Sequence, residues 1–280
     1  MKIFYSAKCL EYRQENHPES PERVETVYNY IKDKGYSIVE PEPCPVSDLL
    51  LVHSRQLINS VENNDFVDFD TPNLPGMFDY AKLSAGGAIN SMQTALNSEN
   101  AFSLMRPPGH HAGRDFLGGF CYFNNIAIAV KKALQKIGKV AIIDIDGHHG
   151  NGTQDIFLGE DNVLYVSLHQ KSAFPRTGLI SEKNCLNYPL FPGTTSKEYM
   201  KTLKEALEKI EEFNADLVAV SAGFDTYKED PLLYLELELE TYTDIGKAIA
   251  ELDKPIFVVL EGGYSKDMPR CVYNFLKGLG

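Results

Sequence analysis

The sequence lacks several features that would quickly assign it to a class of protein. No apolar run approaches the roughly 20 residues that a transmembrane helix needs. The first residues lack the charged region, apolar stretch and cleavage site of a signal peptide. The five cysteines are scattered and never form a CxxC pair, which argues against a disulfide framework and a cysteine zinc knuckle. We therefore expect a cytoplasmic protein that makes no contact with membranes.

Positive charge is also scarce. The chain carries 27 lysines and arginines against 39 aspartates and glutamates, which gives a formal net charge of -12 and a pI of about 5.1. Direct nucleic-acid binding usually requires a basic stripe, and none is present, so we expect no direct contact with nucleic acid. An acidic surface favours cationic ligands instead, although many enzymes are acidic for solubility alone.

Short apolar runs alternate with amphipathic stretches along the chain, and neither a repeat nor a linker divides it. The apolar runs are Lys2–Tyr5, Ala101–Met105, Val140–Ile145, Val163–Leu168, Leu217–Val220 and Ile256–Leu260. The helical patterns include Gly76–Leu96, Ile126–Ile137, Ser196–Phe213 and Tyr242–Leu252. Strands that are apolar throughout and separated by helices are typical of a parallel sheet covered on both faces. The sequence predicts an α/β fold, with residues 1–280 as one domain.

Polar groups framed by glycine follow four of the predicted strands. They are Arg106–His111, Asp146–Gly152, Ser221–Asp225 and Glu261–Tyr264. In a parallel sheet the carboxyl ends of the strands meet at one edge, where ligands bind. We therefore expect these four segments to build one site.

A metal site is the first chemistry that these segments suggest. Asp144, Asp146 and His148 alternate along an extended segment, so their side chains leave the same face. Asp146 and His148 together with Asp225 would provide three ligands and leave one position open, as in a catalytic zinc site. The alternative is that Asp144 and Asp146 cap a turn and His148 is a buried structural residue.

Acid–base catalysis is the second chemistry that these segments suggest. His110 and His111 are too close in sequence to chelate one ion comfortably, but a neutral imidazole can move a proton between water and a leaving amine. Asp144 and Asn151 are candidates to fix their tautomers. The place of Tyr264 after two glycines favours a phenol that donates to a developing oxyanion, and the alternative is an aromatic side chain packed on a helix.

Two further features have structural interpretations. Asp230 precedes Pro231, a pattern that predicts a helix cap. The Gly86-Gly87 pair lies within a helical pattern and favours close packing over phosphate binding. No GxSxG, P-loop or GxGxxG motif occurs.

These residues occur in motifs that resemble those of the zinc-dependent histone deacetylase and acetylpolyamine amidohydrolase family, which has the arginase/deacetylase fold. The resemblance covers nearly the whole chain. The motifs are His17–Arg23, Arg106–His111, Gly118–Asn124, Asp144–Gly152, Ser221–Asp225 and Glu261–Tyr264. The resemblance implies a three-layer α/β/α domain with a mostly parallel central sheet. Asn151 and the segments Glu261–Tyr264 and Arg106–Gly109 resemble those of the class II-like and prokaryotic branch.

The resemblance also implies roles for individual residues. Zinc, one ion per chain, would be held by Asp146, His148 and Asp225. His111 would be the general base and then the acid, His110 would tune the electrostatics, and Tyr264 would polarise the acyl carbonyl. Asp144 would pair with His110, and Asn151 with His111. The Gly119 carbonyl, Phe120 and Phe174 would line a narrow acyl-lysine tunnel.

A structural potassium ion is a further implication. Its ligands would come from Asp144, Asp146, His148, Ser167 and Leu168. A second potassium site near Phe157, Glu160 and Val163 is also suggested.

Leu232 bears on the choice of substrate. Polyamine-selective eukaryotic relatives carry a glutamate at this position, just after an Asp-Pro pair, and Leu232 offers no such charge. The resemblance thus favours an enzyme that hydrolyses the acetylated side chain of lysine in proteins or peptides and releases acetate.

Three alternatives remain. The chain could be an acetylpolyamine or other small-amide deacetylase, a non-catalytic module that binds acyl-lysine, or an arginase-like enzyme with two manganese ions. Arginases use extra carboxylate ligands, whereas Asn151, His148 and His110 occupy those places here, so one metal is favoured. The sequence leaves open whether the chain forms a homo-oligomer.

Overall fold

The structure, a computed structural model that describes residues 1–280, is built on a single eight-stranded sheet. The strands are β1 (Lys2–Phe4), β2 (Ser37–Val39), β3 (Ala101–Ser103), β4 (Val140–Asp144), β5 (Val163–Gln170), β6 (Cys185–Leu190), β7 (Leu217–Ala222) and β8 (Ile256–Leu260). Their order is β2-β1-β3-β8-β7-β4-β5-β6, and every neighbouring pair is parallel. All the carboxyl ends therefore lie at one edge of the sheet.

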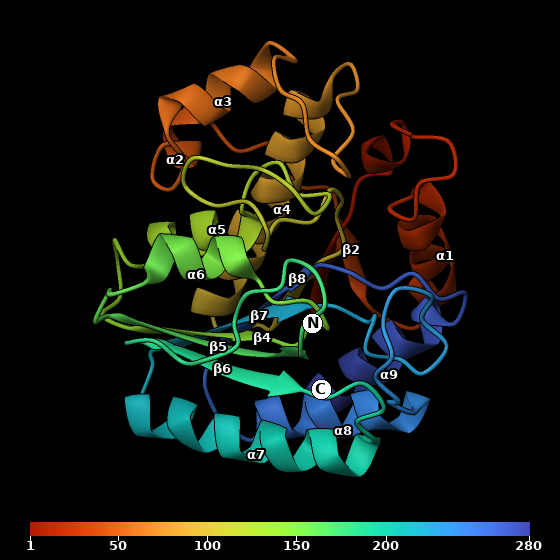
Figure 1. Cartoon of the computed structure of the whole chain (residues 1–280), viewed down its shortest axis with the longest axis vertical. Coiled ribbons are helices and arrows are strands. Elements are labelled where there is room, and N and C mark those ends of the chain that lie inside the picture. Colours follow the sequence, from red (N-terminus) through yellow and green to blue (C-terminus); the bar gives the residue numbers. More distant parts are fainter.

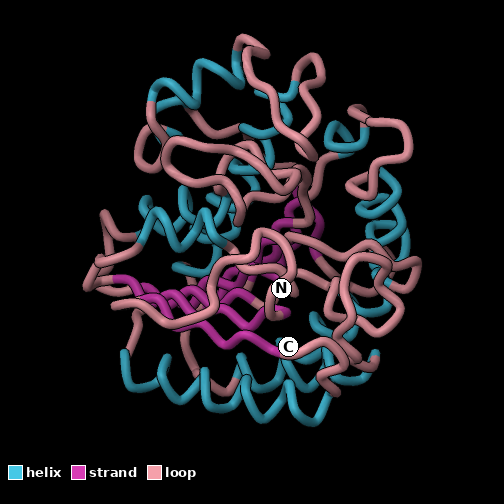
Figure 2. The backbone as a smooth tube through the Cα atoms, viewed as in Figure 1, coloured by secondary structure: helices cyan, strands magenta, loops and turns pink.

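Helices cover both faces of this sheet (Figures 1 and 2). They are the short 3-10 helix η1 (Ala7–Leu10), and α1 (Pro21–Ile31), α2 (Val46–Leu49), α3 (Arg55–Glu62), α4 (Met77–Leu96), α5 (Asn125–Ala133), α6 (Asn151–Phe157), α7 (Ser196–Phe213), α8 (Leu239–Ala250) and α9 (Met268–Leu279). In Figure 1, α7 and α8 lie below the sheet and α4, α5 and α6 above it. This arrangement confirms the predicted three-layer α/β/α fold. None of the helices combines the length and the apolar character needed to cross a membrane.

The central strands are apolar throughout because both of their faces are buried. Along β4, Ala141 and Ile143 belong to the core on the side of α7 and α8, whereas Val140 and Ile142 belong to the core on the side of α4 and α5. Such strands carry no exposed face that would require polar residues. This explains why unbroken apolar runs predicted six of the eight strands.

The sequence analysis did not predict β2 and β6, which form the two edges of the sheet. β2 has only three residues, all at least partly exposed. β6 contains Asn187 and Pro189, and Pro is tolerated mainly on edge strands because it cannot donate to the ladder. An edge strand is covered on fewer sides and so shows no continuous apolar signal.

The predicted helix at Ser196–Phe213 is present as α7 with the same bounds. Thr195 and Glu198 form a capping box at its start, and Asn214 ends it in the left-handed conformation. Leu203, Leu207 and Ile210 fall on its buried face at helical spacing.

Gly86 allows α4 to pack closely against the chain that leads into α2. A Cβ atom on Gly86 would lie 1.9 Å from the carbonyl oxygen of Glu42 and 3.0 Å from the backbone nitrogen of Cys44. Both are backbone atoms, so relief would require one of the segments to move. This agrees with the prediction that Gly86 favours packing rather than phosphate binding.

Gly86→Ala should therefore destabilise the protein, although alanine has the higher helix propensity. We expect the free energy of unfolding to fall by about 1–3 kcal/mol, the usual cost of overpacking, measured by urea denaturation. Gly138→Ala is the control, because its Cβ would approach only a side-chain oxygen of Asp216, at 3.2 Å. Equal stability of Gly86→Ala and the wild type would contradict this account.

Candidate active site

Four neighbouring strands bring the predicted site residues together. In the order β3-β8-β7-β4, the loops that follow these strands carry His110 and His111, then Tyr264, then Asp225, then Asp146 and His148. His110, His111, Asp146, His148 and Tyr264 line one cavity of about 420 Å³. The convergence that was predicted from strand ends is thus present in the fold.

Asp146, His148 and Asp225 form a compact group in which each residue offers one ligand atom. These three atoms lie within 4.8 Å of one another. The Nδ1 atom of His148 is 2.7 Å from Oδ2 of Asp225 and 3.3 Å from Oδ1 of Asp146. Two carboxylate oxygens and one imidazole nitrogen at this spacing are a potential metal site.

Backbone groups hold the other oxygen of each carboxylate. Gly262 N–H donates to Oδ2 of Asp146, and Gly147 N–H donates to Oδ1 of Asp225, both at 2.7 Å. Such bonds fix the orientation of ligand carboxylates. Burial and the charge of Asp146 raise the pKa of Asp225, as expected for two carboxylates that share a buried site and would gain from a cation between them.

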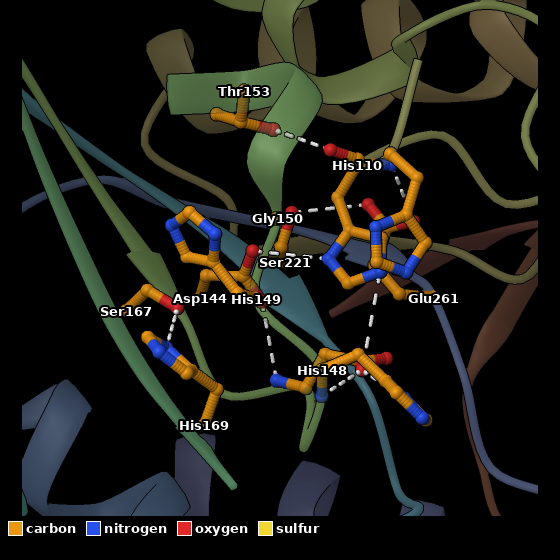
Figure 3. Close-up of polar contacts among 12 residues, drawn as sticks. His110, Asp144, His148, His149, Gly150, Thr153, Ser167, His169, Ser221 and Glu261 are labelled. Carbon is orange, nitrogen blue, oxygen red and sulfur yellow. Dashed lines mark hydrogen bonds and ion pairs between the residues drawn. The ribbon is translucent and has the colours of Figure 1, made fainter. Parts of the chain in front are cut away.

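Acidic groups surround His110, and Figure 3 shows two of them, Asp144 and Glu261. Its Nδ1 lies 3.1 Å from Oδ2 of Asp144, and its Nε2 lies 3.9 Å from Oδ1 of Asp146. Burial disfavours the imidazolium, but the charges of Asp146 and Asp144 outweigh this effect and raise the pKa of His110 to about 10. These carboxylates therefore favour the charged form of His110.

His111 has the opposite protonation state. Burial and the neighbouring charge of His110 hold the pKa of His111 well below its usual value, so this ring is neutral. Its Nδ1 lies 2.8 Å from Oδ1 of Asn151, an acceptor that places the single ring proton on Nδ1. The free electron pair of Nε2 is left as a base.

Tyr264 and three predicted tunnel residues form the walls of the cavity. The rings of Phe120 and Tyr264 meet edge to face with centroids 5.9 Å apart, and the Phe174 ring meets that of His111 at 5.0 Å. Gly119, at a φ of +57°, leaves the imidazole room, because a Cβ atom there would lie 2.3 Å from Cδ2 of His111. Burial raises the pKa of Tyr264 well above its usual value, so its phenol remains a donor.

Leu232 lies at the cavity rim, where 37% of the residue is exposed, beside Leu233 and Tyr234. Asp70, which the sequence analysis did not single out, also lines the cavity and accepts a hydrogen bond from Gly119 N–H at 3.0 Å. The rim is therefore apolar on the Leu232 side and carries one carboxylate from a distant loop.

Of the residues predicted for potassium, Asp146 and His148 belong to the metal group, and Leu168 is buried on β5. Asp144 and Ser167 are register partners on β4 and β5, and both side chains are fully buried. The Ser167 hydroxyl pairs with Nδ1 of His169 at 2.9 Å. Tyr165 adds a hydrogen bond to Oδ2 of Asp144 at 3.0 Å, so the partner of His110 is itself held in place.

Glu261 fixes the turn that carries the two histidines, a contact that the sequence analysis missed. One of its carboxylate oxygens accepts the N–H groups of Gly109 and His110 at 2.7 and 3.1 Å. The other accepts the Ser221 hydroxyl at 3.0 Å (Figure 3). Its position at the end of an apolar strand was the one available signal.

Arg23, in α1, is a second residue whose contacts were missed. Its guanidinium donates to the carbonyl oxygens of Gly263 and Glu261, both at 2.7 Å, and lies 4.6 Å from the centroid of the Tyr264 ring. Arg23 thus joins the N-terminal helix to the loop that carries Tyr264. The His17–Arg23 motif pointed to this segment, but the partners of Arg23 are 238 and 240 residues away.

The expectation that Asp230 caps a helix is wrong. The next helix, α8, begins at Leu239, and the Asp230 carboxylate instead accepts the backbone N–H groups of Leu232, Tyr264 and Ser265. Asp-Pro is common at helix starts, and nothing local distinguishes that use from this one.

Comparison with known proteins places the chain in a family. Residues 17–279 match the model of the histone deacetylase domain. A protein of Archaeoglobus fulgidus named "Probable deacetylase" is 39% identical, over 94% of this chain and 81% of that protein. The acetylpolyamine amidohydrolase of Mycoplana ramosa is 40% identical, over 73% of this chain and 64% of that protein.

A solved structure agrees with these similarities. The acetylpolyamine aminohydrolase of Burkholderia pseudomallei superposes with a TM-score of 0.91 at 25% identity, over 100% of this chain and 98% of that chain. The shared fold, the family match and the grouped histidines and carboxylates point in the same direction. The chain belongs to the histone deacetylase and acetylpolyamine amidohydrolase family, in its prokaryotic branch, and is a hydrolase that acts on linear amides.

Proposed function

We propose that the chain is a zinc-dependent deacetylase that removes acetyl groups from N-acetyl-lysine in peptides or proteins, with residues 1–280 as one catalytic domain. The observation that carries the proposal is the cavity of about 420 Å³, which joins an exposed apolar rim to the buried Asp146–His148–Asp225 group. An acetylated alkyl amine matches this shape, because it has an apolar stem and a terminal amide.

The three ligand residues would hold one zinc ion per chain. Their donor set of two carboxylates and one imidazole fits zinc. When bound, zinc would supply Lewis-acid chemistry that lowers the pKa of a water molecule and polarises an amide carbonyl.

His111 is the proposed proton carrier. The Asn151 contact orients its ring so that Nε2 can take a proton from the attacking water. The same nitrogen then gives the proton to the departing amine, so water and amide become acetate and free amine. His110, held by Asp144, remains beside His111 with ring centroids 4.0 Å apart and sets the local electrostatics.

Tyr264 is the proposed donor to the acyl oxygen. Its phenol remains protonated in the cavity wall and can donate a hydrogen bond as negative charge develops on that oxygen. The rings of Phe120 and Phe174, together with Gly119, would hold the alkyl stem of the substrate and exclude water from it.

A structural potassium ion, held by Asp144, Asp146, His148, Ser167 and Leu168, is part of the proposal. The burial of Asp144 and Ser167 on adjacent strands supports it. The second potassium site near Phe157, Glu160 and Val163 stays a prediction.

Deacetylation of acetylpolyamines is a second candidate function. Relatives that are 33–40% identical to this chain are named acetylpolyamine amidohydrolases. The Asp70 carboxylate in the cavity wall and the net charge of -12 would both favour a cationic substrate. Leu232, in contrast, offers a distal ammonium no charge.

The metal assignment can be tested by metal analysis of the purified chain. We expect about one zinc, or an exchangeable ferrous or cobalt ion, per chain. Asp225→Ala should lose both metal and activity, whereas Asp244→Ala, an exposed residue on α8, should keep both. Tight binding of two manganese ions per chain would instead support arginase-like chemistry.

Tyr264→Phe separates an enzyme from a binding module. The loss of one oxyanion donor usually lowers turnover by about 10²–10³. Folding, metal content and binding of an acetyl-lysine peptide should survive, because only the hydroxyl is removed. Turnover within about threefold of the wild type would exclude the phenol from the reaction.

A substrate panel tests the choice between lysine and polyamine. The wild type should prefer acetyl-lysine peptides over acetylputrescine, even at salt concentrations that screen surface charge beyond about 8–10 Å. Leu232→Glu should shift the preference toward acetylputrescine by a few-fold, because a partly exposed ion pair contributes only about 0.2–1 kcal/mol.

Leu179→Glu adds the same charge outside the cavity and serves as the control. A wild-type preference for acetylputrescine at high salt would replace the lysine proposal with the polyamine one.

A further inference from the structure

Asp230 is a buried carboxylate without a cationic partner. Its side chain lies in the loop between β7 and α8, only 6% of the residue is exposed, and no lysine, arginine or histidine forms an ion pair with it. A buried charge of this kind is costly unless hydrogen bonds compensate for the lost water. The identity of those bonds therefore indicates what the residue does.

All three hydrogen-bond donors to Asp230 are backbone N–H groups, and they belong to two loops of the cavity. Oδ2 accepts Tyr264 N–H at 2.7 Å and Ser265 N–H at 3.2 Å. Oδ1 accepts Leu232 N–H at 3.0 Å. One carboxylate thus joins the loop that carries the phenol to the loop that forms the apolar rim.

The phenol loop has no regular secondary structure to fix it. It runs from the end of β8 at Leu260 to the start of α9 at Met268. Gly263 has a φ of +118°, and a Cβ atom there would lie 2.9 Å from that of Phe224. A chain that turns through such a conformation is held in place by contacts with its surroundings.

Asp230 is suited to this task because its own segment is anchored. Its backbone N–H donates to the Tyr227 carbonyl at 2.9 Å. Lys228 N–H donates to the Leu237 carbonyl at 3.1 Å, and Leu237 N–H to the Thr226 carbonyl at 3.2 Å. These bonds form a short ladder just beyond β7, which itself is central in the sheet.

We propose that Asp230 is a positioning residue that sets the place of the Tyr264 phenol, and through Leu232 N–H the place of the rim. The proposal rests on the proposed function, in which Tyr264 donates to the acyl oxygen. Asp230 lines no part of the cavity and so acts through the two loops rather than on the substrate.

Asp230→Asn is the sharpest variant, because it keeps the size of the side chain. The asparagine amide has only one oxygen that can accept hydrogen bonds. Its NH₂ group would take the place of the second carboxylate oxygen and face a backbone N–H group there, and two donors cannot form a hydrogen bond. Asparagine therefore cannot satisfy both the Tyr264 loop and Leu232, so the Tyr264 loop loses either its own hydrogen bonds or its link to the rim. Asp244→Asn, on the exposed face of α8, makes the same chemical change away from the site.

In the zinc-loaded enzyme, Asp230→Asn should lower kcat for an acetyl-lysine peptide by about 10- to 10²-fold, the scale of a small displacement of a reacting group. Metal content should not change. In a Tyr264→Phe background the same substitution should cost much less, because its effect passes through the missing hydroxyl. An equal fold-loss in both backgrounds would overturn the proposal.

A readout that needs no activity separates this proposal from the proposed function. Fluorotyrosine placed at position 264 should give one sharp fluorine NMR signal in the wild type and in Asp244→Asn. Asp230→Asn should broaden or split that signal. An unchanged signal would refute positioning by Asp230, whereas a wild type that hydrolyses no acetylated amine would refute the proposed function alone.

Asp230→Ser covers the case in which the asparagine variant does not fold, because its hydroxyl can accept a hydrogen bond without adding the NH₂ group. It should show the same dependence on the Tyr264 hydroxyl and the same fluorine signature. Failure of both variants to fold would assign Asp230 to the stability of the chain and overturn its positioning role.

Discussion

Mutual repulsion among buried carboxylates is the constraint on which the site depends. The side chains of Asp144, Asp146, Asp225 and Glu261 are almost fully buried behind one cavity. Negative charges this close are tolerated only where cations or hydrogen-bond donors surround them. Here His110 provides positive charge, and the N–H groups of the glycine-rich turns provide donors. The turns are therefore fixed by the same charges that would hold a metal.

The glycines of these turns have a second physical role, which is to let the chain approach the carboxylates. A Cβ atom on Gly223 would lie 2.1 Å from Oδ2 of Asp146, and one on Gly262 would lie 2.6 Å from the same oxygen. Gly262 can donate its N–H group to Asp146, and Gly223 can lie against the same carboxylate, only because neither residue has a side chain. The glycines of these motifs are thus needed for the close approach of the backbone to the carboxylates, whereas the ionisable residues of the motifs provide the reactive groups.

The sequence predicted the sheet, the metal group and the histidine pair because each leaves a local signal. Buried parallel strands are apolar throughout, and their ends are marked by glycine and by ionisable side chains. The role of Asp230 left no such signal, since its partners are backbone N–H groups up to 35 residues away. The same holds for Arg23 and Glu261, which bind backbone groups of distant turns. A long-range contact to a backbone group does not depend on the side chain of the partner residue. Such a contact therefore cannot be predicted from a pattern of residue types.

The position of β8 has a consequence for the order in which the protein is made. This strand is the last in the sequence, yet it lies between β3 and β7 and joins β2-β1-β3 to β7-β4-β5-β6. While residues 256–260 are still inside the ribosome, a growing chain has two incomplete sheets with exposed edges, and such edges pair readily with other chains. The sheet can close only when β8 has left the ribosome. The loop that follows β8 brings Tyr264, and it also brings Gly263, the partner of Arg23. A nascent chain is thus prone to aggregation, and lacks Tyr264, until these residues have left the ribosome.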